Sequence, residues 1–343
     1  RSIQLAQESI NSSNIEDVTR VIKLIMSLTG VIELVGALLL MIEFVPRYGG
    51  QGVWISFFLS ISSFCNAGFD ILGMEGEYVS LCNYVDSPIV NIVIPLLIII
   101  GGLGFIVWKD LLDYRKRRKL ELHTKIVLIF TGFLIVFGFA VYFFLEYNNP
   151  ATMGEMSIGE RIGASFFQSV TTRTAGYNTI DIASTTEYTK ALSIALMFIG
   201  AAPGSTGGGI KVTTMCVILM TVACVSRGSE DTIILKRKIN KQIVYKSVAI
   251  LFYAALLVII TAAIVAVTTP YGLLDSLFEA TSAFGTVGLT AGPTAAAGAV
   301  AKSMLILAMY LGRVGPVSFA ISLAMRQSPN RKQVMPEGKI VVG

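Results

Sequence analysis

The hydrophobic positions of the chain fall into long runs separated by shorter ones. Runs long enough to cross the hydrocarbon core of a bilayer, about 20 residues, lie at about 21–45, 89–108, 126–147, 190–226 (interrupted), 244–268 and 298–324. Taken in chain order, these six runs form three pairs, and a shorter apolar segment of 11 or 12 residues lies between the two runs of each pair. The shorter segments are 53–64, 162–172 and 273–284. Segments of this length predict helices that enter the membrane and stop inside it.

Each short segment is followed at once by a small, glycine-centred stretch. The order long helix, short helix, glycine loop, long helix therefore occurs three times. Aligning the glycines at positions 68, 176 and 288 gives spacings of 108 and 112 residues. This near-constant period predicts an internal repeat. The aligned loops are Asn66-Ala67-Gly68, Thr174-Ala175-Gly176 and Thr286-Val287-Gly288.

The charge pattern predicts one orientation for all three units. Only 14% of the 343 residues are charged and 54% are hydrophobic, which indicates that lipid is the main solvent. Seventeen of the 27 Lys and Arg residues lie in 109–125, 227–246 and 325–343, each after the second long helix of a unit. This bias predicts that these segments are cytoplasmic, whereas 70–88 and 270–297, which contain no Lys or Arg, lie outside.

The sequence offers little support for catalysis or nucleic-acid binding. His123 is the only histidine, and the four cysteines show no metal-ligand spacing. The predicted spans hold no paired carboxylates and no nucleophile with a neighbouring base. The basic clusters flank membrane spans, which favours a membrane surface over a nucleic acid. We therefore expect no enzyme activity, no organic cofactor and no nucleic-acid partner.

The glycine loops predict a lined ion path. Non-helical backbone at membrane depth is tolerated only where protein or a water-filled cavity surrounds it. Backbone carbonyls can replace the hydration shell of a cation, and glycine reaches the backbone angles that this requires. Asn66, Thr174 and Thr286 could add side-chain oxygens. The alternative is that the three glycines only let helices pack closely.

The run 190–226 is interrupted by "GAAPGSTGGGIK" (200–211), which holds five glycines and a proline. Glycine costs about 1 kcal/mol and proline about 3 kcal/mol in a helix interior, so the run should break into two halves joined by a loop. ATP binding is rejected, because Ile210 occupies the lysine position of a P-loop and no strand precedes it. The alternative to a functional loop is a kinked packing helix.

Arg313 lies about fifteen residues into the last long run. An arginine at membrane depth is expensive, so its side chain should face a cavity or a partner. We expect it to contact carbonyls of 200–209. The alternative is a structural pairing with Glu279 or Glu33.

Five motifs together resemble the Trk/Ktr/HKT cation transporters, most closely the bacterial Ktr-type potassium-translocating membrane subunit. They are "FCNAGF" (64–69), "TTRTAGYNT" (171–179), "GAAPGSTGGGIKVTT" (200–214), "SAFGTVGLTAG" (282–292) and "GRVGPVSFA" (312–320). The resemblance covers essentially the whole chain.

The resemblance implies an all-α membrane protein in which repeated M1–pore helix–M2 units surround a pseudo-fourfold central pore. Three of the four units would be present in this chain, with the first lying upstream. The implied divisions are a cytoplasmic connector (1–20), the second unit (21–108), a basic connector (109–125), the third unit (126–226), a connector (227–243), the fourth unit (244–324) and a tail (325–343). The end of the tail, "MPEGKIVVG" (335–343), resembles the family's C-terminus, which lies at the dimer interface.

The resemblance also implies potassium uptake across the bacterial plasma membrane, with potassium at the filter carbonyls and regulation through a gate. The filter residues are those of the three aligned loops, and a glycine in each is the family's mark of potassium selectivity. Implied partners are a second copy of the chain, a cytoplasmic ring of nucleotide-binding RCK-type subunits, the lipid bilayer and sodium. The alternative is an alternating-access cation symporter coupled to sodium, although carriers often have inverted repeats. The implied gate residues are Gly200, Pro203, Gly204, Ser205, Thr206, Gly207, Gly208, Gly209 and Arg313.

Overall fold

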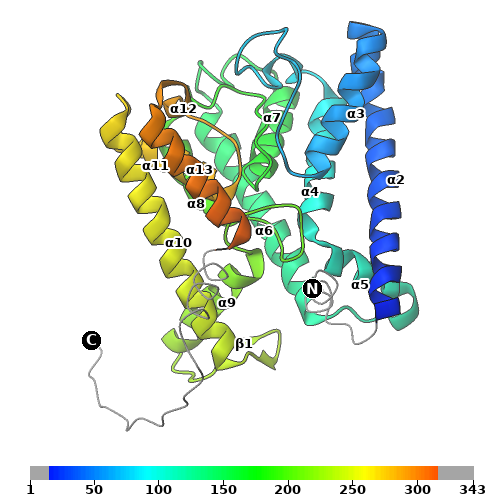
Figure 1. The fold of residues 1–343 in the computed structure, drawn as a ribbon, viewed down its shortest axis with the longest axis vertical. Helices are drawn as coiled ribbons and strands as arrows, with labels where there is room; N and C mark the ends of the chain where they lie inside the picture. The colour runs from blue at the N-terminus through cyan, green and yellow to red at the C-terminus, as the bar shows by residue number, and fades with distance from the viewer. Residues whose placement is uncertain (1–14, 316–343) are drawn as a thin grey trace.

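The computed structural model describes residues 15–315 of the chain, which form a bundle built mostly of helices (Figure 1). The first group is α2 (Ile15–Tyr48), α3 (Gly50–Phe64), the 3-10 helix η1 (Cys82–Tyr84), α4 (Pro88–Leu103) and α5 (Phe105–Arg117). The second is α6 (Leu122–Glu146), α7 (Ile158–Thr171), α8 (Glu187–Phe198) and α9 (Val212–Ser226). The third is α10 (Lys241–Thr268), α11 (Leu273–Gly285), α12 (Pro293–Ala296) and α13 (Ala299–Val314).

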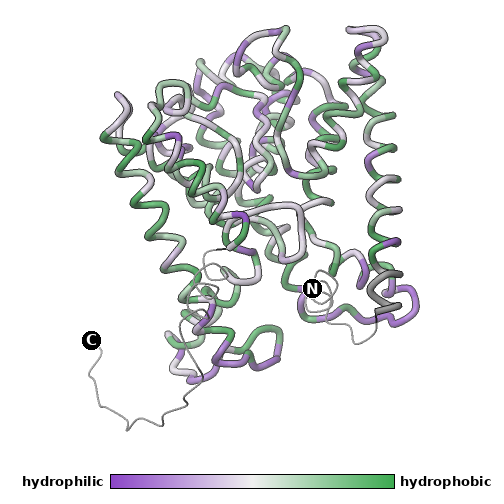
Figure 2. Tube along the Cα trace, in the orientation of Figure 1, coloured by the Kyte–Doolittle hydropathy of each residue, from purple (hydrophilic) through white to green (hydrophobic). Residues whose placement is uncertain are grey.

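Three of the predicted membrane spans are confirmed as long, apolar, unbroken helices. Ile22–Tyr48, Leu122–Glu146 and Lys241–Thr268 are each long and hydrophobic enough to cross a bilayer. Figure 2 shows hydrophobic positions along these helices and hydrophilic positions at the lower turns. The chain is therefore a multi-pass membrane protein by length and composition of its helices.

The predicted long helix at 89–108 is present but bent, so it is not one continuous helix. The helix α4 ends at Leu103, and the chain turns by 91° into α5. The turn falls at Gly104, whose φ of 86° and ψ of 148° belong to a region essentially restricted to glycine. The turn lies in the glycine-rich sequence "IGGLG" at 100–104.

The two basic connectors contain more structure than predicted. In 109–125, helix α5 continues to Arg117 and α6 already begins at Leu122. In 227–243, a short antiparallel hairpin forms from β1 (Ile233–Ile234) and β2 (Arg237–Lys238), and α10 begins at Lys241. The prediction for 325–343 and the end of the predicted run 298–324 lie outside the described residues, as does most of 1–20.

Local capping fixes where several helices begin. Ser157 and Glu160 form a reciprocal capping box at the start of α7, which confirms the predicted short helix at 162–172 and begins it four residues earlier. Ser87 caps α4 by accepting from the amide of Val90, with a proline in the first turn. Helices α4 and α7 therefore begin where a side chain accepts a hydrogen bond from one of the amides that the first helical turn leaves unpaired.

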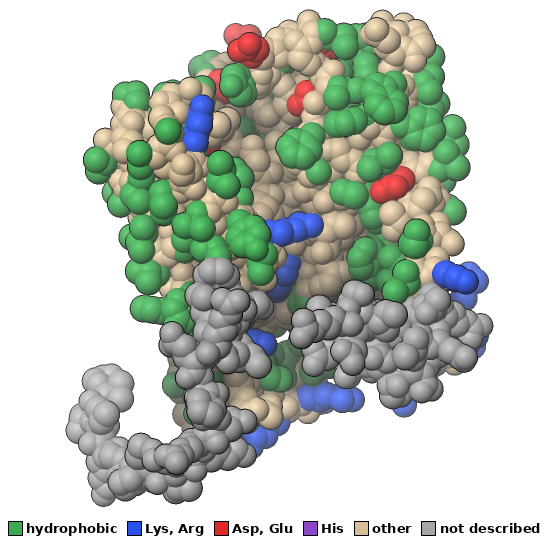
Figure 3. Space-filling view, viewed as in Figure 1, with side chains coloured by type: hydrophobic (Ala, Val, Ile, Leu, Met, Phe, Trp, Pro, Cys, Tyr) green, Lys and Arg blue, Asp and Glu red, His purple; other side chains and the backbone are tan. Residues whose placement is uncertain are grey.

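The helices pack in sequence order around a hollow. α4 packs against α7, and α8 packs against α11, so each group of helices touches the next. Among the described helices, the first and third groups share no packing of similar extent. Figure 3 shows the resulting hollow between two flanks covered with hydrophobic side chains, with basic side chains inside it.

Candidate functional site

The three glycine loops share one backbone conformation. They follow the C-terminal ends of α3, α7 and α11. In each loop, the first residue and the glycine two positions later have positive φ, while the residue between them does not. Positive φ is uncommon outside glycine, so its recurrence at three aligned non-glycine positions is a specific feature. The values are 51° and 69° (Asn66, Gly68), 74° and 98° (Thr174, Gly176), and 52° and 97° (Thr286, Gly288).

The loops also lie edge to edge. A Cβ placed on Gly68 would overlap the carbonyl oxygen of Ala175, and one placed on Gly176 would overlap that of Val287. In both cases the neighbouring oxygen belongs to the residue before the glycine of the next loop. A Cβ on Gly288 meets only the Cα of Gly176, at 3.6 Å. The same relation therefore links loop one to loop two and loop two to loop three.

Buried hydrogen bonds hold these loops in place. The hydroxyl oxygen of Tyr177 lies 2.7 Å from Ser62 Oγ and 2.9 Å from the Phe69 carbonyl oxygen, and its single proton can be donated to either, which ties the second loop to the first. Thr171 donates through Oγ1 to the carbonyl of Tyr177 at 2.6 Å. The side chain of Tyr177 is fully buried, so these bonds fix the loop without competition from water.

A cavity of about 340 Å³ lies against the three glycines. It is lined by Gly68, Gly176 and Gly288, together with the carboxylates of Asp70 and Asp181. No Lys or Arg belongs to its lining. Carboxylates in a cleft of this kind raise the local concentration of cations.

The interrupted run forms a loop between Phe198, the end of α8, and Val212, the start of α9. Successive residues of this loop meet the first residues of the three glycine loops. Thr206 Oγ1 donates to Asn66 Oδ1 at 3.3 Å. A Cβ on Gly207 or Gly208 would overlap the hydroxyl of Thr174 or Thr286, respectively. The absence of side chains at 207 and 208 therefore allows the loop to approach the glycine loops closely.

Residues 2–333 match the family model TrkH, described as a cation transport protein. The chain belongs to the TrkH family. The resemblance stated from the five motifs is thereby confirmed.

Relatives of this TrkH-family chain include two named uptake proteins. The Ktr system potassium uptake protein B of Bacillus subtilis is 39% identical over 340 residues, which are 99% of this chain and 75% of that protein. The potassium/sodium uptake protein NtpJ of Enterococcus hirae is 37% identical, covering 96% of this chain and 74% of that protein. These relatives are membrane cation transporters and not enzymes.

The crystal structure of the potassium transporter TrkH from Vibrio parahaemolyticus has the same fold. It aligns with a TM-score of 0.69 at 20% sequence identity. The alignment covers 93% of this chain and 65% of that chain, so this chain spans slightly less than two thirds of the solved protein.

Two cationic side chains hold the loop between α8 and α9 of this TrkH-family chain. Arg313 donates through Nη1 to the carbonyl of Thr206, and Lys211 donates through Nζ to the carbonyl of Gly207 at 2.6 Å. The alternative pairing of Arg313 with Glu279 is wrong, because Thr290 and Thr294 hydrogen-bond that carboxylate. Within residues 15–315, no ion pair to Arg313 is present.

The remaining predicted gate residues lie in or beside the same loop. The hydroxyl of Ser205 donates to the carbonyl of Ala202 at 2.6 Å, and the amide of Gly200 donates to the carbonyl of Ile210 at 2.8 Å.

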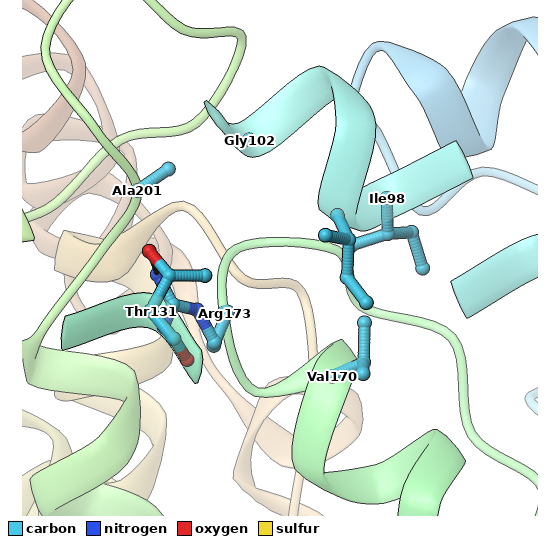
Figure 4. A pocket seen from close by; sticks show the side chains of 7 residues that line it. Ile98, Gly102, Thr131, Val170, Arg173 and Ala201 are labelled. Carbon is cyan, nitrogen blue, oxygen red and sulfur yellow. Dashed lines mark hydrogen bonds between the residues drawn. The ribbon is translucent and has the colours of Figure 1, made fainter. Parts of the chain in front are cut away.

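Sequence reasoning missed Arg173, which lies between α7 and the second glycine loop. Its side chain is only 6% exposed, and the described residues place no carboxylate against it. Its guanidinium reaches Thr131 and the carbonyl of Gly200 at 3.4 to 3.5 Å. Figure 4 shows Arg173 beside Thr131 and Ala201, around a cavity of about 10 Å³. An arginine within an intramembrane motif was the signal available in the sequence.

Proposed function

We propose that this chain forms most of a potassium-uptake pore in a bacterial plasma membrane. The observation that carries the proposal is the shared alternation of φ in three loops that lie edge to edge. Alternating the sign of φ lets consecutive carbonyls turn toward the same side, where they can replace water around a cation. The filter would comprise residues 66–68, 174–176 and 286–288.

Potassium as the transported ion is supported by the family and by the loops. Relatives in Bacillus subtilis and Vibrio alginolyticus are named potassium uptake proteins. A glycine stands at the same point of all three loops. The name of the Enterococcus hirae relative includes sodium, which supports sodium as a further ion. The buried Thr286 hydroxyl has no hydrogen-bond partner among the described residues and could face the ion.

A fourth glycine loop would complete the filter. Gly288 meets no neighbouring carbonyl among the described residues, although Gly68 and Gly176 each do. The first and third helix groups share no packing of similar extent among the described helices, which leaves room for a further unit between them. A fourth unit with the same organisation would fill this room and make the arrangement pseudo-fourfold.

The loop 200–209 would act as the gate. It contacts the first residue of all three glycine loops, so an ion leaving the filter meets it next. Arg313 and Lys211 add positive charge there, which opposes the passage of a cation. The loop is held by separate hydrogen bonds to Asn66, Arg313 and the ends of α4 and α5, each worth about 1 kcal/mol when neutral, so it can move without unfolding the bundle.

The assembly would be a homodimer docked on a cytoplasmic ring of RCK-type nucleotide-binding subunits. The exposed basic residues at the end of α5, Arg115, Lys116 and Arg117, support a cytoplasmic docking surface. Anionic lipid headgroups would bind the same charges. The nucleotide would act on the ring, and no organic cofactor would bind this chain.

Ion flux through the full protein in liposomes tests the proposal. A pore should pass potassium down its gradient in the absence of sodium, and the flux should not saturate at low potassium. The second candidate, a sodium-coupled symporter, is favoured by the name of the Enterococcus hirae relative. It predicts that a sodium gradient alone drives potassium accumulation. Absence of potassium flux under both conditions would refute both candidates.

A further inference from the structure

The break after α4 leaves backbone groups without helical partners. In a continuous α-helix, the carbonyls of residues 100–102 would accept from the amides of residues 104–106. The helix stops at Leu103 instead, so these carbonyls need other donors. Unpaired polar groups at membrane depth are costly, which makes their actual partners informative.

The intramembrane loop supplies two of the donors. The amide of Ala202 donates to the carbonyl of Gly102 at 3.1 Å, and the amide of Thr206 donates to the carbonyl of Gly101 at 3.4 Å. The loop that is proposed as the gate is therefore bound to the end of α4 by its main chain. These bonds do not depend on any side chain of the loop.

The first turn of α5 supplies the remaining contacts. The indole Nε1 of Trp108 donates to the carbonyl of Ile100 at 3.0 Å. The amide of Phe105 donates to the carbonyl of Gly204 at 3.0 Å, so the loop also accepts from α5. The Trp108 ring, 7% exposed, packs at 5.5 Å from the ring of Phe64, the last residue of α3.

Gly104 makes this arrangement possible. Its φ of 86° permits the 91° turn, and a Cβ placed there would lie 2.7 Å from the carbonyl oxygen of Pro203. Any other residue would strain the turn and push against the loop. The turn and the loop therefore fit each other only with glycine at this position.

We propose that the bend between α4 and α5 is the anchor of the intramembrane loop, and that Trp108 is the positioning residue that holds the bend. The amide of Phe105 and the carbonyls of Gly101 and Gly102 bind the loop, yet they are also groups that a continuous helix would pair. Loop binding and a straight α4–α5 helix are therefore alternative uses of the same groups. The loop leaves the filter when the bend opens. The inference rests on the proposed gating role of the loop.

Two substitutions in the full protein, with matched controls, test the anchor. Trp108→Phe keeps an aromatic ring but removes the indole donor, and Gly104→Ala disfavours the turn. Trp54→Phe changes an exposed tryptophan, and Gly132→Ala adds a methyl group where no atom lies within 4 Å. Trp108→Phe loses one hydrogen bond, worth about 1 kcal/mol, so it should raise the potassium flux measured without the regulatory subunits about fivefold. Gly104→Ala should raise it further, and both controls should behave as the wild type.

Ion selectivity separates this role from a merely structural one. Because the anchor lies outside the glycine loops, Trp108→Phe should keep the wild-type preference for potassium over sodium while its flux rises. Flux equal to that of Trp54→Phe, or lower flux, would overturn the anchor. If Gly104→Ala does not fold, the fluorescence of Trp108 in a protein whose other tryptophans are phenylalanine provides a second measurement. When the nucleotide-loaded regulatory subunits activate transport, iodide should quench the fluorescence of Trp108 more strongly. Unchanged quenching would overturn the proposal.

A loop deletion distinguishes failure of the anchor from failure of the gate. Removal of residues 202–207 should raise flux if the loop obstructs the path. If the deletion raises potassium flux but Trp108→Phe leaves it at the wild-type value, only the anchor is overturned. A deletion that leaves flux unchanged would overturn the gating role and the anchor together.

Discussion

Alanine at Gly176 is the sharpest test of the filter geometry. The residue has a φ of 98°, where a side chain costs about 1–2 kcal/mol. The added Cβ would also overlap the carbonyl oxygen of Val287 in the next loop. Either that oxygen or the Gly176 backbone must retreat by about 1 Å to restore van der Waals contact. The displaced carbonyl is one of those proposed to bind the ion.

We expect Gly176→Ala to reduce the preference for potassium over sodium by about tenfold or more, since 1.4 kcal/mol corresponds to a factor of ten. The assay is the reversal potential of the full protein in a planar bilayer with potassium on one side and sodium on the other. Gly159→Ala is the control, because it adds a methyl group to α7 where no atom lies within 4 Å. An unchanged reversal potential in Gly176→Ala would refute the assignment of these carbonyls to the filter.

The same substitution at Gly288 tests the fourth loop. In residues 15–315, a Cβ on Gly288 meets only the Cα of Gly176 at 3.6 Å, an ordinary contact. If a fourth loop stands beside it in the full protein, Gly288→Ala should shift the reversal potential as much as Gly176→Ala does. A clearly smaller shift would contradict a fourth loop in the equivalent position.

Three further predictions concern the supporting contacts. Arg313→Gln, which removes the charge that binds the Thr206 carbonyl, should increase potassium flux several-fold, measured by rubidium uptake into liposomes; unchanged transport and gating would remove Arg313 from the mechanism. Lys190→Met should lower the free energy of unfolding by about 1–3 kcal/mol, because it leaves Asp275 without the ammonium that lies 2.9 Å away. In thermal unfolding, the double variant with Asp275→Asn should regain part of the lost stability, and fully additive losses from the two substitutions would contradict the pairing. Burial raises the pKa of Cys82 to about 11, so at pH 8 iodoacetamide should alkylate this thiol about a hundredfold more slowly than an exposed thiol. The alkylation rate should increase as the pH rises toward that pKa, and a rate that levels off near pH 9 would contradict the prediction.

Some features of the site could be predicted from residue types alone. The apolar runs at 21–45, 126–147 and 244–268 predicted single helices, because a span of that length has few other ways to satisfy its backbone in lipid. The glycines and proline of 200–209 predicted a break, because their intrinsic helix cost is local. Five motifs with their spacing identified the family before any contact was known.

Other features depended on contacts between distant residues. The run at 89–108 is apolar apart from Asn91, so hydropathy could not reveal that α4 ends at Leu103. The bend exists because Gly104 fits against Pro203, a residue about a hundred positions away. The binding of Lys211 to the Gly207 carbonyl, and the burial of Arg173 without a carboxylate, are likewise results of packing.

The sequence by itself determined which long segments are apolar enough to span a membrane and which loops carry glycine, because these properties follow from the hydrophobicity and conformational range of each residue. The orientation of the segments stays a prediction from the charge pattern. Only the tertiary structure decided that the three loops meet edge to edge and that the interrupted segment is bound beneath them by α4 and α5. Those arrangements depend on pairings between backbone groups, and a backbone amide or carbonyl carries no mark in the sequence of the partner it will find.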